Sequence, residues 1–549
     1  MTRESFLQGA MVLALAGLVS RVLGAIYRIP LSWVIGDEGL GLYGMAYPIY
    51  NMLLTVSTMG IPLAVCKMIA DRVARGRLVD ARRVTRVSLA FLALSGALFS
   101  CVLYLSAGFF ARFYHEPRAY LSIVAISPAI FFVAIMSALR GYFQGLHRMT
   151  PTAISQVAEQ IVRVTAMVVM ALMLLPRGLE YAAAGATSGA VAGGLAGLIV
   201  LLVMFWREGG ALGLEEGPAR RARGAHRRLG TEQRLGDGSP PGGGTGRILA
   251  ELIALAVPIS VAAVIMPLMN MLDAAIVPIR LQAGGVAAAR ATALFGQLSQ
   301  MAFPLVFMPT SVTSAVSLAL VPAVSEAAAL GRWDVIRERA ALGVRMTVIL
   351  TLPCVVGFYL LSSEIPGLLF KQPMAGVPVA ALASGLFFLA LQQTASGVLQ
   401  GLGRTALPVR SLAVGALVKA AISWTLTAIP AFGIRGAALG TVGGFVVASA
   451  INLTSMERLV GSVIDLRATV LKPAVAVSAM ALAVAGAFSL VTSMTASTDL
   501  ATVAAIAAGA VTYLVVLLAI GGMTASDLET IPRVGPALSG FLRRFGLTR

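Results

Sequence analysis

Apolar residues recur along the chain in runs of about 20 residues, divided by shorter polar segments. At about 1.5 Å per residue, a helix of that length crosses the roughly 30 Å hydrocarbon layer of a membrane. A transmembrane barrel would instead show strict alternation. The pattern predicts an all-α polytopic membrane protein with about fourteen spans. The predicted spans are 6–35, 43–70, 84–108, 120–143, 154–175, 181–206, 248–279, 292–321, 341–362, 376–399, 409–430, 434–456, 470–493 and 500–522.

Four short motifs occur twice, in the same order and at an offset of 255 or 256 residues. The matching segments are 45–48 and 301–304, 76–77 and 331–332, 144–148 and 400–404, and 182–185 and 437–440. Six spans fall in each copy, so both copies have the same orientation, as in two-lobed transporters with a central site. The predicted divisions are a first lobe (1–206), a linker (207–247), a second lobe (248–456) and a C-terminal part with two further spans (457–549).

The polar segments between spans differ in charge. Arginines are dense in every second segment, and the positive-inside rule then places both termini in the cytoplasm and requires an even number of spans. The segment 207–247 is rich in arginine and ends in a run of Ser, Pro and Gly, which predicts a flexible, basic, cytoplasmic linker. Its arginines can contact anionic headgroups of membrane lipids.

Composition narrows the function further. The 549 residues are 58% hydrophobic and 12% charged, with a net charge of +18. Because the basic residues lie in loops between apolar runs, no nucleic-acid partner is predicted. Three cysteines and three histidines are scattered without ligand spacing, so neither a metal nor another cofactor is expected. A nucleotide-binding P-loop pattern is missing as well, and we predict that the protein is not an enzyme.

Ionisable side chains inside predicted spans indicate a structural or functional role, because inserting one near the bilayer centre costs about 2.5 to 3.5 kcal/mol of free energy. Arg21 and Arg28 lie seven residues apart on one face of the first span. Neither has an acidic residue within one helical turn. Two such arginines form a cationic stripe that suits the oxygens of a diphosphate.

Further charges lie in later spans. Glu159 and Arg163 are spaced i, i+4 in the fifth span, which suits either a buried ion pair or a substrate contact. Asp273, with Asn270 one turn earlier, interrupts the seventh span. Lys419 lies in the eleventh span and is the repeat equivalent of Arg163 at an offset of 256.

Several motifs also resemble one known family. They are the segments 20–24, 39–48 and 156–164 and the two Gln-Gly-Leu-x-Arg motifs at 144–148 and 400–404. They resemble the stage V sporulation protein B branch of the MOP exporter superfamily, which is related to MurJ-type lipid II flippases and more distantly to MATE drug antiporters. The resemblance covers nearly the whole chain except the linker.

The resemblance implies a flippase of the cytoplasmic membrane that moves a lipid-linked, anionic sugar precursor outward by alternating access. The expected partners are a lipid-linked sugar diphosphate, membrane lipids and cell-envelope synthesis proteins. Arg21 matches a cavity arginine of MurJ-type flippases, and Arg28 is shifted by one residue from a second. A third arginine of their span two is missing here, and Gln297 replaces part of an aspartate-arginine pair in span eight. The expected substrate-binding residues are therefore Arg21, Arg28, Glu159, Arg163 and Gln297.

Some MurJ-type proteins bind sodium through an aspartate of span seven and oxygen ligands from spans eleven and twelve. Here span eleven supplies Lys419, so we expect its ammonium group to pair with Asp273 beside Asn270 in place of sodium. Two other readings stay open: a cation-coupled multidrug antiporter of the same superfamily, and a membrane scaffold without transport. An antiporter for cations would need carboxylates and aromatic residues in its cavity, and a scaffold would need no charges inside the membrane.

Overall fold

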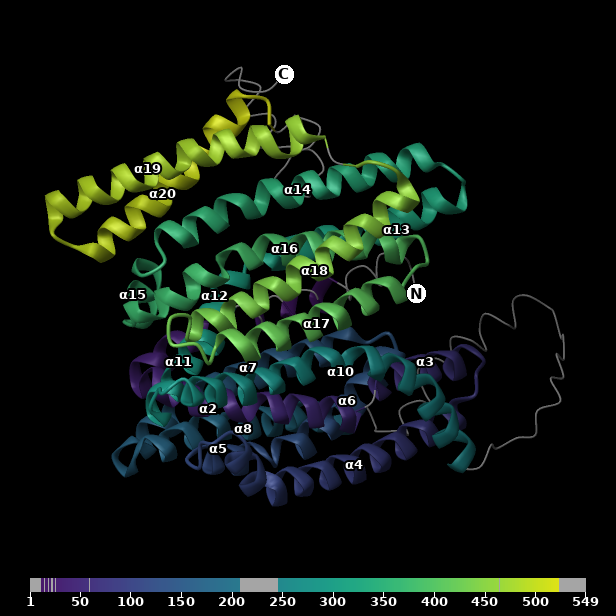
Figure 1. Ribbon diagram of the computed structural model, residues 1–549. Coiled ribbons are helices and arrows are strands. Elements are labelled where there is room, and N and C mark those ends of the chain that lie inside the picture. Colours follow the sequence, from purple (N-terminus) through teal and green to yellow (C-terminus); the bar gives the residue numbers. More distant parts are fainter. Residues whose placement is uncertain are drawn as a thin grey trace. The chain divides into compact units, whose positions relative to one another are not determined.

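The computed structural model describes residues 11–207, 245–463 and 465–522, except positions 14, 18, 21, 22, 25 and 59 and several side chains within 257–266 and 464–468. Every long regular element in these residues is a helix (Figure 1). The all-α architecture predicted from the sequence is confirmed. The predicted linker at 207–247 lies almost entirely outside the described residues.

The helices follow one another with short connections. Those of the first half are α2 (Arg28–Thr58), α3 (Ile61–Ala74), α4 (Leu78–Phe113), α5 (Ala119–Ile126), α6 (Ala129–Gly145), α7 (Met149–Leu174) and α8 (Leu179–Arg207). Those of the second half begin with α10 (Thr245–Ala283), α11 (Ala288–Gly296), the π-helix η3 (Gln297–Ala302), α12 (Phe303–Phe307) and α13 (Thr310–Ala329). They continue with α14 (Trp333–Leu360), α15 (Glu364–Phe370), α16 (Gly376–Gly401), α17 (Ala406–Leu426), α18 (Ile434–Val460), α19 (Lys472–Thr495) and α20 (Thr498–Ala519).

Twelve helical stretches in the described residues are long and apolar enough to cross a membrane. The first of them, Arg28–Ala74, contains a break at Gly36, whose φ of 64° and ψ of −170° are not helical. This break coincides with the end of the first predicted span. The 39-residue helix α10 covers the seventh predicted span. The count of about fourteen spans stays a prediction.

The chain divides into two compact units, Met1–Ala275 and Ile276–Arg549, so the boundary falls inside α10. The early part of α10 contributes Ile248 and Leu252 to the core of the first unit, where they pack with Val65, Leu139 and Phe143. The lobe boundary predicted from the repeat lies earlier, at the linker. The early part of α10 therefore belongs by packing to the first unit, although it follows the linker in sequence.

The sequence repeat is also a repeat of helix packing inside each unit. A β-carbon added at Gly141 of α6 would lie 2.6 Å from the carbonyl oxygen of Pro62 in α3. One added at Gly397 of α16 would lie 2.5 Å from the carbonyl oxygen of Ser317 in α13. Both glycines let two helix backbones approach closely, as small residues do in membrane helix pairs. The predicted internal repeat is confirmed.

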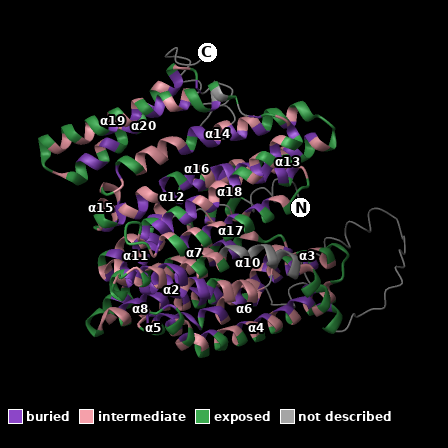
Figure 2. Ribbon diagram, in the orientation of Figure 1, coloured by how far each residue is buried: buried purple, intermediate pink, exposed green. Residues whose placement is uncertain are grey.

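Helices α19 and α20 lie outside the repeat and run side by side (Figure 1). The Tyr513 hydroxyl of α20 donates to the Ile349 carbonyl of α14 over 2.8 Å, which fixes this pair of helices to the second unit. Figure 2 shows many exposed residues along both helices, and large apolar side chains such as Leu482, Met494 and Val511 are among them. In a membrane protein such a surface faces lipid.

A candidate charged site within the first unit

A row of tyrosines marks one side of α2. Tyr43, Tyr47 and Tyr50 are spaced four and three residues apart, which places them on one helical face. The ring centres of Tyr43 and Tyr47 are 4.5 Å apart, and those of Tyr47 and Tyr50 are 5.8 Å apart. The hydroxyl of Tyr27 lies 2.9 Å from that of Tyr43. This face of α2 is thus lined by aromatic rings that carry polar groups.

Arg28 lies at the start of α2, next to this row. Its Nη1 donates to the Gly24 carbonyl over 2.6 Å, and its guanidinium carbon lies 4.9 Å from the ring centre of Tyr27. Within the described residues Arg28 makes no ion pair, and its buried Nε has no hydrogen-bond partner. The structure therefore places a cation within a membrane-spanning stretch without a carboxylate beside it.

Two more arginines share a single carboxylate between α6 and α7. Glu159 Oε2 lies 2.8 Å from Arg140 Nη2, and its Oε1 forms an ion pair with Arg163. Arg140 Nε also donates to the Ser155 hydroxyl over 3.1 Å. These three charged side chains are only 12% to 20% exposed. The predicted i, i+4 pair is thus present, with a third member added.

Small residues of α8 hold this part of α7 in place. A β-carbon added at Gly193 would lie 2.7 Å from the carbonyl oxygen of Glu159, and one added at Gly197 would lie 3.2 Å from the Glu159 β-carbon. Any larger residue at these positions would push α7 away from α8. The position of the Glu159 carboxylate therefore depends on two glycines of the neighbouring helix.

These groups form one cluster. Tyr47 lies within electrostatic range of both Arg28 and Arg163, and Gln160 of α7 lies 3.4 Å from a β-carbon added at Gly24. The cluster contains three guanidinium groups, those of Arg28, Arg140 and Arg163, and within the described residues one carboxylate, that of Glu159, pairs with the last two. Buried polar atoms without a hydrogen-bond partner in the described residues also gather here: Arg28 Nε, Tyr47 Oη, Gln156 Oε1 and Arg163 Nε. The cluster has an excess of positive charge and unused donors, and we call it the arginine cluster.

The five residues predicted to bind the substrate are divided among the two units and the part of the chain outside the described residues. Arg28, Glu159 and Arg163 lie together in the arginine cluster, and Arg21 lies outside the described residues. Gln297 is fully buried at the start of η3 in the second unit. The roles predicted for these five residues stay predictions.

The residues predicted for ion coupling are divided between the two units of the chain. Asp273 and the exposed Asn270 belong to the first unit, whereas Lys419, which is 7% exposed, belongs to the second. The Asp273–Lys419 ion pair stays a prediction.

The role of Arg140 was not predicted from the sequence. This residue lies three residues before the end of the predicted fourth span, where an arginine ordinarily extends its charge toward the membrane surface. A signal was nevertheless present, because Glu159 carries one negative charge and Arg28 and Arg163 carry two positive ones. A search for further charged residues in spans four to six would have found Arg140.

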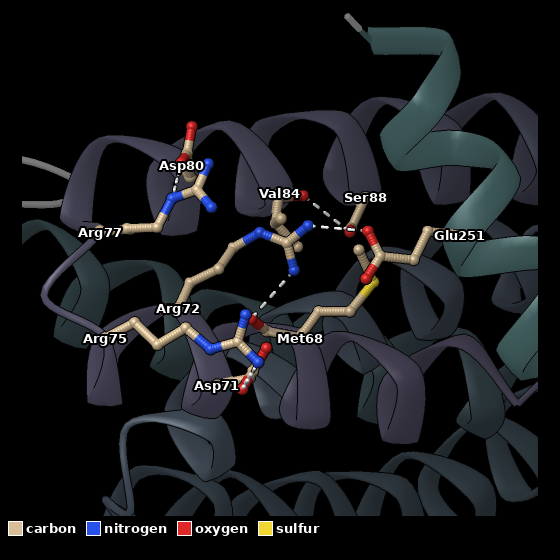
Figure 3. A network of polar contacts seen from close by, with 9 residues as sticks. All are labelled: Met68, Asp71, Arg72, Arg75, Arg77, Asp80, Val84, Ser88 and Glu251. Carbon is tan, nitrogen blue, oxygen red and sulfur yellow. Dashed lines mark hydrogen bonds and ion pairs between the residues drawn. The ribbon is translucent and has the colours of Figure 1, made fainter. Parts of the chain in front are cut away.

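Ionic contacts also occur at both ends of α4. Near the N-terminal end of α4, Arg72 of α3 forms an ion pair with Glu251 of α10, with 2.8 Å between Arg72 Nη2 and Glu251 Oε2 (Figure 3). Arg72 Nη1 also donates a hydrogen bond to the Met68 carbonyl over 3.2 Å. The charge pattern predicts that this end is cytoplasmic. The ion pair joins two helices that are about 180 residues apart in sequence.

At the other end of α4, Arg118 lies 2.5 Å from Glu38 and 2.8 Å from Glu116. The Arg118 guanidinium donates hydrogen bonds to the carboxylates of Glu116 and Glu38. These bonds, together with the negative charges of both carboxylates, raise the pKa of the Arg118 guanidinium above its ordinary value. Arg118 therefore stays charged at any pH that the cell reaches. This contact joins the connection between α4 and α5 to α2.

Solved structures of other proteins share the fold of this chain. The fold is similar to "Lipid II flippase MurJ, inward closed conformation", with a TM-score of 0.66, 13% identity, and coverage of 92% of this chain and 98% of that one. It is also similar to an inward-facing MATE family multidrug resistance transporter of the MOP superfamily, with a TM-score of 0.62, 14% identity, and coverage of 81% and 95%. The chain therefore has the multi-pass membrane fold that these two transporters share.

Sequence comparison then gives the family. A family described as "Polysaccharide biosynthesis protein" matches residues 6–221. Stage V sporulation protein B of Bacillus subtilis is 30% identical over 97% of this chain and 99% of its own length, and the chain belongs to its family. Lipid II flippase MurJ of the same organism is 26% identical over 83% of this chain and 84% of its own length. The resemblance predicted from the sequence motifs is confirmed.

Proposed function

We propose that this protein is a flippase that moves a lipid-linked, anionic sugar precursor across the cytoplasmic membrane by alternating access. The cargo is a polyprenyl-diphosphate sugar, either lipid II-like or of another kind. The observation that carries the proposal is the arginine cluster of the first unit, which lies in membrane-spanning helices. Arg140 and Arg163 share the Glu159 carboxylate, and Arg28 contacts the Tyr27 ring and makes no ion pair within the described residues.

The chemistry of the cluster suits a diphosphate. A guanidinium group binds phosphate oxygens with two parallel hydrogen bonds, and such contacts are strongest where little water competes. Glu159 neutralises part of the charge of Arg140 and Arg163, which leaves about two positive charges with Arg28 included. The diphosphate of such a cargo carries about two negative charges, which match these two positive charges. The tyrosine hydroxyls of α2 add neutral donors for phosphate or sugar oxygens.

We further propose that Arg21 extends the arginine cluster along the first span and that Gln297 contacts the cargo from the second unit. Asp273, Asn270 and Lys419 are proposed for ion coupling. The names of the relatives support a lipid-linked sugar as the cargo. One relative is named a lipid II flippase, and the matching family is described as "Polysaccharide biosynthesis protein". We place both termini and the linker in the cytoplasm.

A cation-coupled multidrug antiporter is the second candidate, because the fold is also similar to a MATE transporter. The arginine cluster argues against it. A cationic drug bound there would meet about two uncompensated positive charges, and like charges in a site of low dielectric repel strongly.

The experiment that separates the two candidates depletes the protein and measures both activities. We expect a lipid-linked sugar precursor to accumulate on the cytoplasmic side, while resistance to cationic drugs stays unchanged. Loss of drug resistance with normal precursor export would instead identify the protein as an antiporter.

A further inference from the structure

A basic pocket of about 560 Å³ lies in the second unit, where α16 ends, α17 begins and α18 ends. Its lining includes Arg404, Thr405, Leu407, Arg410, Arg458 and Leu459. The charge pattern predicts that this end of the helices is cytoplasmic. The pocket is separate from the arginine cluster, which belongs to the first unit.

The helix packing explains why these residues meet. Gly403, with a φ of 75°, turns the chain sharply from α16 into α17. Helix α17 then packs against α18, and a β-carbon added at Gly415 would lie only 2.5 Å from the Gly444 carbonyl oxygen. Because α17 and α18 run in opposite directions, the start of α17 lies beside the end of α18. Arg404 and Arg458 are thus brought to one pocket from positions far apart in sequence.

The three arginines of the pocket have no acidic partner among the residues that the structure describes. Arg404, Arg410 and Arg458 are exposed, and none of them forms an ion pair within the part of the chain that the structure describes. The pocket also receives the first turn of α17, whose unpaired backbone N–H groups carry partial positive charge. The pocket therefore combines guanidinium groups, backbone donors and space for an anion.

The internal repeat shows that this charge exceeds what topology requires. Arg404 corresponds to Arg148 in the first copy, so both copies have one arginine at this turn. At the same offsets, Arg410 corresponds to Ile154 and Arg458 to Val203. A single arginine per copy satisfies the positive-inside rule at this position. Helix α8 of the first copy ends with Arg207, one turn beyond Val203, so both copies also have an arginine in the last turn of this helix. Arg410 has no such counterpart in the first copy and needs another explanation.

Apolar residues beside the pocket indicate the kind of anion. Leu407, Arg410, Val414 and Leu417 are spaced three, four and three residues apart, so they share one face of α17. Val414 is 42% and Leu417 is 71% exposed on this membrane helix. An amphiphile can place its phosphate among the arginines and its acyl chains along this stripe.

We propose that this pocket binds the phosphate headgroup of an anionic phospholipid from the cytoplasmic leaflet. Each arginine close to a negatively charged headgroup strengthens binding by about fivefold. Loss of all three should therefore weaken binding by about a hundredfold. The proposal does not depend on the identity of the cargo, because it concerns lipid binding at a different site.

The test uses the purified full chain in detergent and follows its melting temperature and, by native mass spectrometry, its bound lipids. Phosphatidylglycerol or cardiolipin is titrated against phosphatidylcholine. The pocket variant carries R404Q, R410Q and R458Q. A control variant with R86Q, R332Q and R339Q loses the same charge from exposed positions at the same predicted side.

We expect the anionic lipids to bind and stabilise the wild type and the control variant, and the pocket variant to bind them about a hundredfold more weakly. Equal binding by all three proteins would overturn the proposal. Inorganic phosphate that protects as well as the lipids would refute a lipid headgroup as the ligand. Binding of polyprenyl diphosphate without binding of cardiolipin would assign the pocket to the cargo and also overturn it.

Discussion

The two units repeat the same helix packing but not the same charges. At an offset of 256, Arg140 corresponds to Ser396, Glu159 to Gly415 and Arg163 to Lys419. Of these three charged positions, only that of Arg163 keeps a charged residue in the second unit. The close contacts between helices, in contrast, recur at matching glycines.

The corresponding interior of the second unit is joined by neutral polar groups. Gln393 Oε1 accepts hydrogen bonds from Thr313 over 3.2 Å and from Ser314 over 3.1 Å. Asn452 Nδ2 donates to the Ser396 hydroxyl over 2.9 Å. Neutral hydrogen bonds of this kind hold helices together without attracting an ion. The repeat therefore preserves the packing of helices, whereas the arginine cluster belongs to the first unit.

Removing the one carboxylate of the arginine cluster should have the largest effect. Glu159→Gln leaves Arg140 and Arg163 in a poorly solvated place without their counter-charge, which should lower stability by about 3 to 5 kcal/mol. Thermal unfolding in detergent measures this loss. Glu338→Gln removes an exposed carboxylate of the second unit and should change little. Equal melting temperatures for the two variants would contradict the description of the cluster.

Arg28→Ala and Arg21→Ala should abolish transport but leave the fold intact. Each substitution removes a charge-assisted contact with the cargo that is worth about 1.5 to 3 kcal/mol. Neither removes the partner of a buried carboxylate, so the fold should not be destabilised. Complementation of a deletion strain at matched expression measures the effect.

Arg280 provides the control in the second unit. Its guanidinium carbon lies 4.6 Å from the Trp424 ring centre, and its Nε donates to the Trp424 carbonyl over 2.8 Å, much as Arg28 contacts Tyr27 and Gly24. Arg280→Ala should retain transport. If Arg28→Ala complements as well as Arg280→Ala, the special role of the first unit is wrong.

Matching glycine substitutions test the conserved packing. Gly141→Ala and Gly397→Ala should each destabilise their unit by about 1 to 3 kcal/mol, because the new β-carbon meets a backbone carbonyl. Gly108→Ala and Gly486→Ala meet no atom within 4 Å and serve as controls. Denaturation midpoints compare the four variants. Damage at only one of the two contact glycines would show that the packing is not repeated.

The smallest effect is expected at the ion pair between Arg72 and Glu251, because Glu251 is 46% exposed. Its loss through Glu251→Gln should cost less than about 1 kcal/mol. Amide exchange should nevertheless become faster at the start of α10, since the contact joins that helix to α3. Asp71→Asn breaks a pair within α3 alone and should leave exchange in α10 unchanged. Identical exchange in both variants would mean that the ion pair does not hold α10.

Much of this architecture was predictable, because long apolar runs and repeated motifs are local or periodic features of a sequence. The spans, the repeat and the family could be identified from them, and so could the i, i+4 spacing of Glu159 and Arg163. Features that depend on contacts between distant segments could not. Arg140 meets Glu159 only after α6 and α7 pack, and the early part of α10 joins the first unit through contacts with residues such as Val65. The π-helix at Gln297 likewise leaves no periodic signal.

We propose that the arginine cluster of the first unit binds an anionic, lipid-linked cargo during transport. Vesicles that contain the purified protein and a fluorescent polyprenyl-diphosphate sugar test it most directly, because an impermeant quencher reports how much labelled lipid has crossed. We predict rapid crossing with the wild type and with Arg280→Ala, and a loss of at least tenfold in rate with Arg28→Ala, as expected for a lost contact of about 1.5 kcal/mol or more. Equal rates for wild type and Arg28→Ala, or no crossing with the wild type, would contradict the account.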